Sequence, residues 1–160
     1  MDPTDKESIS PLHAFLAGLG PDGSGRRLDE VLALPDSALE RIHDYIQWLF
    51  PLPTRSGAQP GAPVLSRADL AAIPADPAAV ANLRRAAGRM LAFYRGTDHW
   101  LVRADHNHLR ITRIITSLRL LVGFEDARAF HAAIMALQDA AGGPVDPGNL
   151  AYWDRALAGE

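Results

Sequence analysis

Residues 106–122, with the sequence HNHLRITRIITSLRLLV, carry the clearest helical pattern in the chain. Asp105 or Asn107 can cap the start of a helix here, and Gly123 can end it. The segment is too long for a strand. The apolar residues recur every three or four positions, so they share one helix face: Ile111, Ile114, Ile115, Leu118, Leu121 and Val122. We therefore predict an amphipathic helix over residues 106–122.

The same periodicity recurs along the rest of the chain, and no convincing alternation of period two is found. Residues 36–50 have a cap at Asp36 or Ser37 and are closed by Pro51, which predicts one helix. Further helices are expected at 77–96, 130–137, 11–17, 28–34, 66–73 and 149–158. The fold class is therefore all-α: a single compact domain of about seven or eight helices over residues 11–160, after a flexible N-terminus of residues 1–10.

The composition excludes several classes of protein. The 160 residues include no cysteine, which excludes a disulfide framework, a thiolate zinc site and a cysteine nucleophile. No apolar run approaches the ~18 residues needed to span a bilayer, and the acidic N-terminus is unlike a secretory signal. We expect a cytoplasmic protein with no membrane span.

The charge is uneven along the chain. Residues 84–119 hold eight arginines against only Asp98 and Asp105, whereas residues 1–80 carry eleven acidic and six basic side chains. The arginines can form an anion-binding surface, or they can pair with the acidic N-terminal half. The pI of about 6.0 favours pairing, so we expect no nucleic-acid partner.

Two constellations can carry chemistry. In the first, a helix over 36–50 places four polar or aromatic side chains beside its apolar stripe: His43, Asp44, Gln47 and Trp48. They can bind a polar ligand against an aromatic wall, or they can satisfy hydrogen bonds to a neighbouring helix.

The second constellation surrounds the N-terminus of the 106–122 helix, where free N–H groups favour an anion. Its members are His106, Asn107, Arg110 and Arg113. A phosphate or carboxylate fits this set. The alternative is that the two arginines bridge to Asp44 or Glu40.

A metal or haem is a weaker possibility. His106 and His108 form a His-x-His pair near His99, Asp98 and Asp105, but on a helix the two rings point roughly 200° apart. We assign no metal site and expect no cofactor. The alternative is a haem or metal protein, with candidate axial ligands His43, His106, His108 and His131.

The two constellations resemble a known family. The stretches HDYIQWLFP at 43–51 and HNHLRITRI at 106–114, with Ala62–Leu65 and Met90–Tyr94 between them, are similar to the conserved region of the opioid growth factor receptor family. The likeness covers roughly residues 12–140. It implies an all-α fold and a non-enzymatic domain, in a family that is named in animals for binding an opioid pentapeptide. The short length and the Ala- and Arg-rich composition are similar to those of bacterial members.

We expect a binding pocket between the 36–50 and 106–122 helices, which requires that the two motifs touch. Its ligand is a small anionic molecule or a short peptide, with an amine at Asp44 and a carboxylate at the arginines. An alternative is a scaffold for protein interaction. In that case the long Pro51–Val64 connector, itself a candidate binding loop, meets the partner. An enzyme is disfavoured because no nucleophile lies beside His43 and Asp44.

Overall fold

The computed structural model describes residues 8–160, and within them it contains helices and no strand. The all-α prediction is therefore confirmed. Nine helices occur in this range, slightly more than the seven or eight expected. They are α1 (Pro11–Leu16), α2 (Leu28–Leu32), α3 (Asp36–Arg41), α4 (Ile46–Leu49), α5 (Arg67–Ala72), α6 (Pro77–Gly96), α7 (His106–Leu121), α8 (Phe124–Ala140) and α9 (Pro147–Ala158).

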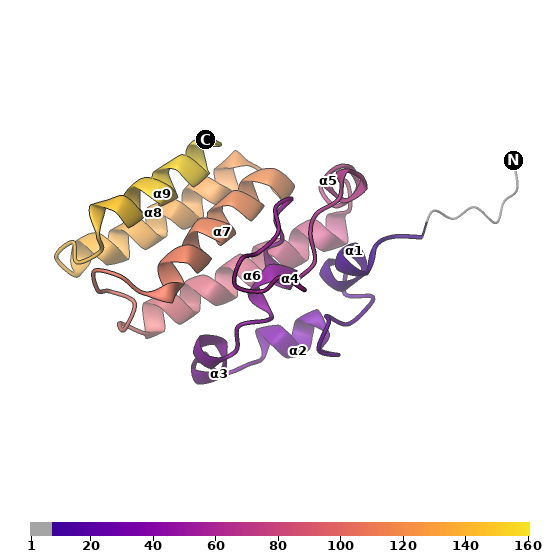
Figure 1. Ribbon diagram of the computed structural model, residues 1–160, viewed down its shortest axis with the longest axis horizontal. Coiled ribbons are helices and arrows are strands. Elements are labelled where there is room, and N and C mark those ends of the chain that lie inside the picture. The colour runs from indigo at the N-terminus through magenta and orange to yellow at the C-terminus, as the bar shows by residue number, and fades with distance from the viewer. Residues whose placement is uncertain (1–7) are drawn as a thin grey trace, which may run out of the picture.

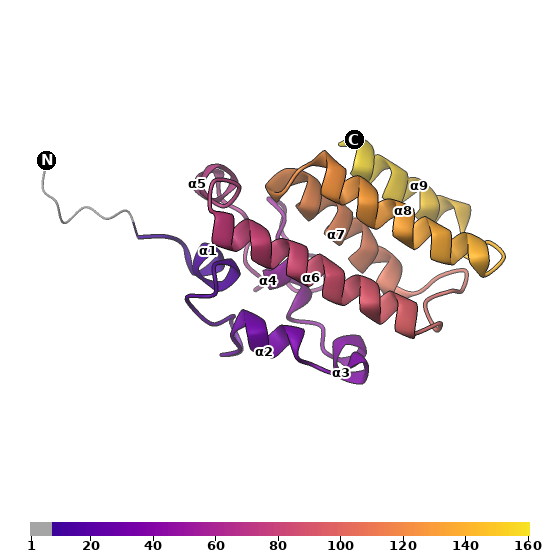
Figure 2. The same ribbon diagram turned by 180° about the vertical axis from the view of Figure 1, so that it is seen from behind.

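The long helix α6 lies between two groups of helices (Figures 1 and 2). The helices α7, α8 and α9 pack side by side on one side of it, and the short helices α1 to α4 lie on the other. One continuous hydrophobic core runs through both groups, from Phe15 and Leu39 to Ile114 and Trp153. None of the helices in residues 8–160 is long and apolar enough to cross a lipid bilayer.

The helix ends follow the local signals in the sequence. Asp76 caps α6 by accepting a hydrogen bond from the Ala78 amide, and Asp105 caps α7 through the Asn107 amide. Ser66 and Asp69 form a reciprocal capping box at the start of α5. These short polar side chains satisfy backbone donors that the first turn of a helix leaves free.

The predicted flexible N-terminus lies mostly outside the described residues, which begin at residue 8. Its last residue is held in place. Ser10 caps α1, and its hydroxyl also donates a hydrogen bond of 2.6 Å to the Asp69 carboxylate.

The predicted single helix over 36–50 is wrong. The chain leaves the helix at Ile42, whose backbone is extended, and α4 begins only at Ile46. The carbonyls of Leu39 and Ile42 bond to the guanidinium of Arg110, at 2.7 and 2.9 Å, and the Tyr45 hydroxyl also donates to Leu39. Since the side chains satisfy these carbonyls, the helical ladder can end without leaving them unpaired.

Part of the arginine-rich segment pairs with the acidic N-terminal half, as one of the two interpretations requires. Arg85 bonds to Asp29 at 3.0 Å and Arg89 to Asp36 at 2.8 Å, which ties α6 to α2 and α3. The suggested bridges from Arg110 and Arg113 to Asp44 or Glu40 are absent from residues 8–160.

Candidate functional site

The two motifs touch each other, because α7 sends its arginines into the 39–50 segment. Arg110 is buried, and its two terminal nitrogens make four contacts to that segment. Besides the two carbonyls described above, they donate to the Tyr45 hydroxyl at 3.2 Å and to Nδ1 of His43 at 3.2 Å. One turn along α7, Arg113 donates to the Phe50 carbonyl at 3.2 Å. The pocket hypothesis depends on this contact between motifs.

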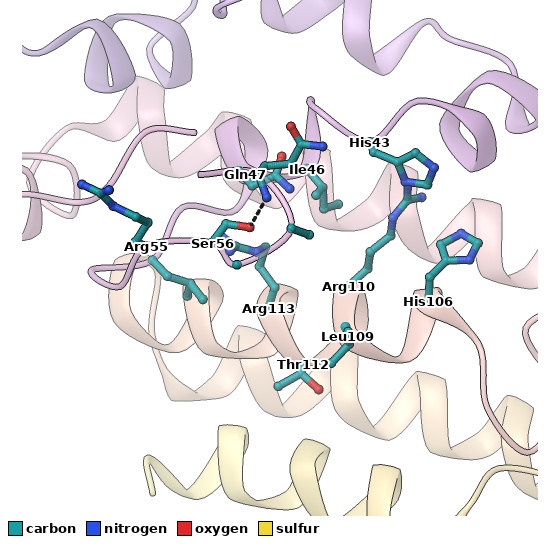
Figure 3. A pocket seen from close by; sticks show the side chains of 14 residues that line it. His43, Ile46, Gln47, Arg55, Ser56, His106, Leu109, Arg110, Thr112 and Arg113 are labelled. Atoms are coloured by element: carbon teal, nitrogen blue, oxygen red, sulfur yellow. Dashed lines mark hydrogen bonds between the residues drawn. The ribbon is translucent and has the colours of Figure 1, made fainter. Parts of the chain in front are cut away.

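A cavity of about 540 Å³ opens between these two segments and the connector that follows Pro51 (Figure 3). The connector is closed at its base, where the Leu65 amide donates to the Leu52 carbonyl at 2.9 Å. Five of the lining side chains are basic, being histidines or arginines. They are His43, Arg55, His106, Arg110 and Arg113. Its apolar lining comes from Ile46, Leu52, Ala58 and Leu109. None of the described residues that line it is acidic.

Of the two lining arginines on α7, Arg113 has the more unused hydrogen-bonding capacity in the described structure. Its guanidinium is half-buried and its one hydrogen bond goes to Phe50. Burial lowers the pKa of Arg113 below its ordinary value, because no carboxylate offsets the loss of solvent. Arg110, in contrast, already uses both terminal nitrogens on protein groups.

Gln47 lines the cavity and is only 5% exposed. Its side-chain oxygen is covered and has no hydrogen-bond partner among residues 8–160. A buried polar atom without a partner costs about 1–3 kcal/mol, so a turn of this amide toward the cavity, where a ligand can meet it, relieves that cost.

A smaller cavity of about 250 Å³ also has Gln47 in its lining. It is lined by Asp44 and Trp48 as well, the two residues of the first constellation that do not line the larger cavity. Asp44 is already paired. Arg26 donates to one of its carboxylate oxygens at 2.9 Å, and the Ser24 hydroxyl donates to the other at 2.5 Å. The Ser24 hydrogen bond is the main reason why the pKa of Asp44 lies below its ordinary value. Trp48 packs edge-on against Phe15, with 5.6 Å between ring centroids.

Residues 35–99 match the family model of the opioid growth factor receptor (OGFr) conserved region. The match confirms the resemblance over the first motif, the connector and the Met90–Tyr94 segment. It spans less than half of the chain, and the second motif at 106–114 lies beyond it. No curated protein and no solved structure matches the chain.

The OGFr-matched segment therefore forms one wall of the cavity, and α7 forms the other. Five of the eight predicted ligand-binding residues line the larger cavity: His43, Gln47, His106, Arg110 and Arg113. Asp44 and Trp48 line the smaller one together with Gln47. Asn107 lines neither cavity, because its side chain is fully buried against Glu40 and Tyr94.

The histidines considered as axial ligands of a haem do not all converge on one point. His106 and His108 do not converge, because both lie in the first turn of α7. Both ring nitrogens of His108 are engaged, with the Trp100 carbonyl at 2.8 Å and the Asn149 amide at 3.0 Å. His131 is paired with Asp154 on α9. His43 and His106 are neighbours, with ring centroids 5.6 Å apart.

Several residues of the site were not predicted individually. Arg55, Ser56 and Gln59 enter the larger cavity from the connector, whose length alone had marked it as a candidate binding loop. Leu109 lies at the cavity and is 73% exposed, off the apolar stripe of α7. Glu40 bonds to both His99 and His106, which no local spacing indicates.

Proposed function

We propose that this protein is a non-enzymatic binding protein for a small anionic molecule with an apolar body, held in the larger cavity. The observation that carries the proposal is the lining itself. Three arginines face a cavity to which the described chain contributes no carboxylate. Its volume lies within the range of about 300–1,000 Å³ usual for small-molecule sites.

Arg113 and Arg55 supply the recognition of the anion. A guanidinium has five N–H donors in a planar fork that fits a carboxylate or a phosphate. Arg113 uses one of its nitrogens on Phe50, so its others are available to a ligand, and an anion also offsets the cost of its burial. Arg55 approaches from the connector and is exposed. Arg110 acts mainly by holding the wall in place.

The remaining lining specifies the rest of the ligand. Ile46, Leu52 and Leu109 offer apolar contact to its body. The Gln47 amide, once turned toward the cavity, offers its unpartnered oxygen to a hydrogen-bond donor, such as a hydroxyl or an amide N–H. A short peptide has a terminal carboxylate, amide donors and apolar side chains, so it belongs to the same chemical class. The description of the matched region as part of a receptor agrees with a binding role.

A protein partner is the second candidate, because the 51–64 connector is both a wall of the cavity and largely exposed. On this alternative a partner inserts an acidic or C-terminal segment into the same cavity. The haem alternative has less support, since His43 and His106 pack against each other on one side of the cavity.

The test compares charged and neutral probes of the same shape. Benzoate and phenyl phosphate are titrated into the protein beside benzyl alcohol, and binding is followed by NMR chemical shifts. We expect saturable binding of the anions at residues of the cavity. Arg113→Gln should weaken it about tenfold or more, since a hydrogen bond to a charged group contributes about 1.5–3 kcal/mol.

The matched control is Arg128→Gln, which removes an exposed arginine of α8 that pairs only with Glu125 in the described structure. This variant should bind the anions like the parent protein. Equal binding by Arg113→Gln and the parent, or equal binding of benzyl alcohol and benzoate, would contradict the proposal.

A further inference from the structure

Four side chains with metal-binding groups converge beside the larger cavity, around the amide of Asn107. Glu40 comes from the end of α3, and His99 comes from the loop after α6. Asp105 and His106 come from the start of α7. The carboxylate oxygens of Glu40 and Asp105 and a ring nitrogen of His106 all lie within 4.8 Å of one another.

His99 extends this group on the side of Glu40. Its Nε2 lies 2.8 Å from one carboxylate oxygen of Glu40, and Nε2 of His106 lies 2.8 Å from the other. The side-chain nitrogen of Asn107 lies close to all four groups. It is 2.9 Å from Glu40 and from Asp105, 3.5 Å from His99 and 3.4 Å from His106.

Hydrogen bonds to the two carboxylates satisfy this arrangement without an ion. The amide nitrogen of Asn107 has two hydrogens, which Glu40 and Asp105 accept. The two imidazoles must then carry hydrogens on Nε2 to donate to Glu40. Glu40 therefore accepts three hydrogen bonds, from both imidazoles and from the amide of a fully buried residue.

A cation can replace the hydrogens that these groups share. If both Nε2 atoms are unprotonated, they point lone pairs toward the same region as the two carboxylates. Rotation of the Asn107 amide by half a turn then directs its oxygen inward, and its nitrogen donates to the Tyr94 hydroxyl, which can accept as well as donate.

We propose that Glu40, His99, Asp105 and His106 bind one divalent transition-metal cation. Two imidazole nitrogens and two carboxylates are a donor set suited to Zn²⁺ and to Co²⁺ or Fe²⁺. The two carboxylates balance the charge of the ion. Both histidines are partly exposed, which gives the ion a path from solvent. His106 also lines the larger cavity, so the metal would lie at its rim.

The test uses Co²⁺ as an optical probe on the full chain, after removal of metals with a chelator. We expect one equivalent of Co²⁺ to give visible absorption bands, and Zn²⁺ to displace it with the same stoichiometry by calorimetry. Glu40→Gln and His99→Gln should each weaken binding at least tenfold.

The matched control is His131→Gln, which removes a histidine paired with an aspartate elsewhere on the surface. It should leave Co²⁺ binding unchanged. Circular dichroism reports whether each variant is folded, and the partly exposed His99 provides the test if Glu40→Gln fails to fold. Absence of stoichiometric binding, or an equal loss in His131→Gln, would overturn the proposal. These readouts do not depend on the anion probes, so the two proposals can fail separately.

Discussion

At the scale of single residues, Arg110 decides how the two motifs fit together. Its buried guanidinium bonds to two carbonyls of the 39–50 segment, and it lies 5.5 Å from the centre of the Tyr45 ring. Burial raises the pKa of Tyr45 to about 12, so the phenol stays protonated and donates to Leu39. A charged side chain that bonds to carbonyls is acting here as a structural link.

We therefore expect Arg110→Ala to lower the free energy of unfolding by about 3 kcal/mol or more, because it removes four hydrogen bonds of a buried side chain and leaves the Ile42 carbonyl without its side-chain partner. Arg110→Lys keeps the charge without the planar fork and should recover only part of the loss. Urea unfolding followed by circular dichroism measures both. A change within about 0.5 kcal/mol, as expected for the exposed Arg128→Ala, would contradict this role.

At the scale of elements, the start of α6 is bonded to α1, which lies at the other end of the N-terminal half of the chain. Asp76 caps α6 with one carboxylate oxygen and contacts Nε2 of His13 in α1 with the other, at 2.7 Å. The hydrogen bond to His13 is the largest cause that lowers the pKa of Asp76 below its ordinary value. The same carboxylate therefore starts the longest helix and holds α1 against it.

This shift predicts an acid-dependent loss of stability. Because the pKa of Asp76 is lower in the folded state, its contribution is present above the unfolded pKa of about 3.9 and is lost as the pH falls through the folded value. Asp76→Asn keeps a capping oxygen but cannot ionise, so its stability should fall less steeply than that of the parent between about pH 5 and pH 3. Asp76→Ala also loses the cap, at about 1 kcal/mol. Urea titrations of the parent and both variants at several pH values across this range measure the free energy of unfolding. Identical slopes of that free energy against pH for the parent and Asp76→Asn would contradict the expectation.

At the scale of the whole molecule, one core connects the short N-terminal helices with the α7–α9 group. Trp100 and Trp153 are fully buried on the side of α7, and Trp48 is half-buried against α1. The Trp153 indole donates to the His108 carbonyl at 3.0 Å, which anchors α9 to α7. The 39–50 segment in turn depends on α7 through Arg110.

We expect the chain to unfold as a single unit in urea, because neither group of helices has a core of its own. Tryptophan fluorescence and far-ultraviolet circular dichroism should give coincident transitions. A Trp48→Phe variant, whose fluorescence reports only Trp100 and Trp153, should keep that coincidence. Two separate transitions would instead indicate that residues 11–160 form more than one folding unit.

Local signals in the sequence predict the features that depend on neighbours along the chain. Asp76 with Pro77, Asp105 and Gly123 mark helix ends because capping and backbone strain are local, and the stripe at Ile111 and Ile114 marks a buried face for the same reason. The break at Ile42 depends on packing, since Arg110, far away in the sequence, bonds to the carbonyls of Leu39 and Ile42 that the break frees. The tertiary structure also decided the cavity between α7 and the connector, and the meeting of Glu40 with His99 and His106. These features arise from packing between distant segments, which no local periodicity encodes.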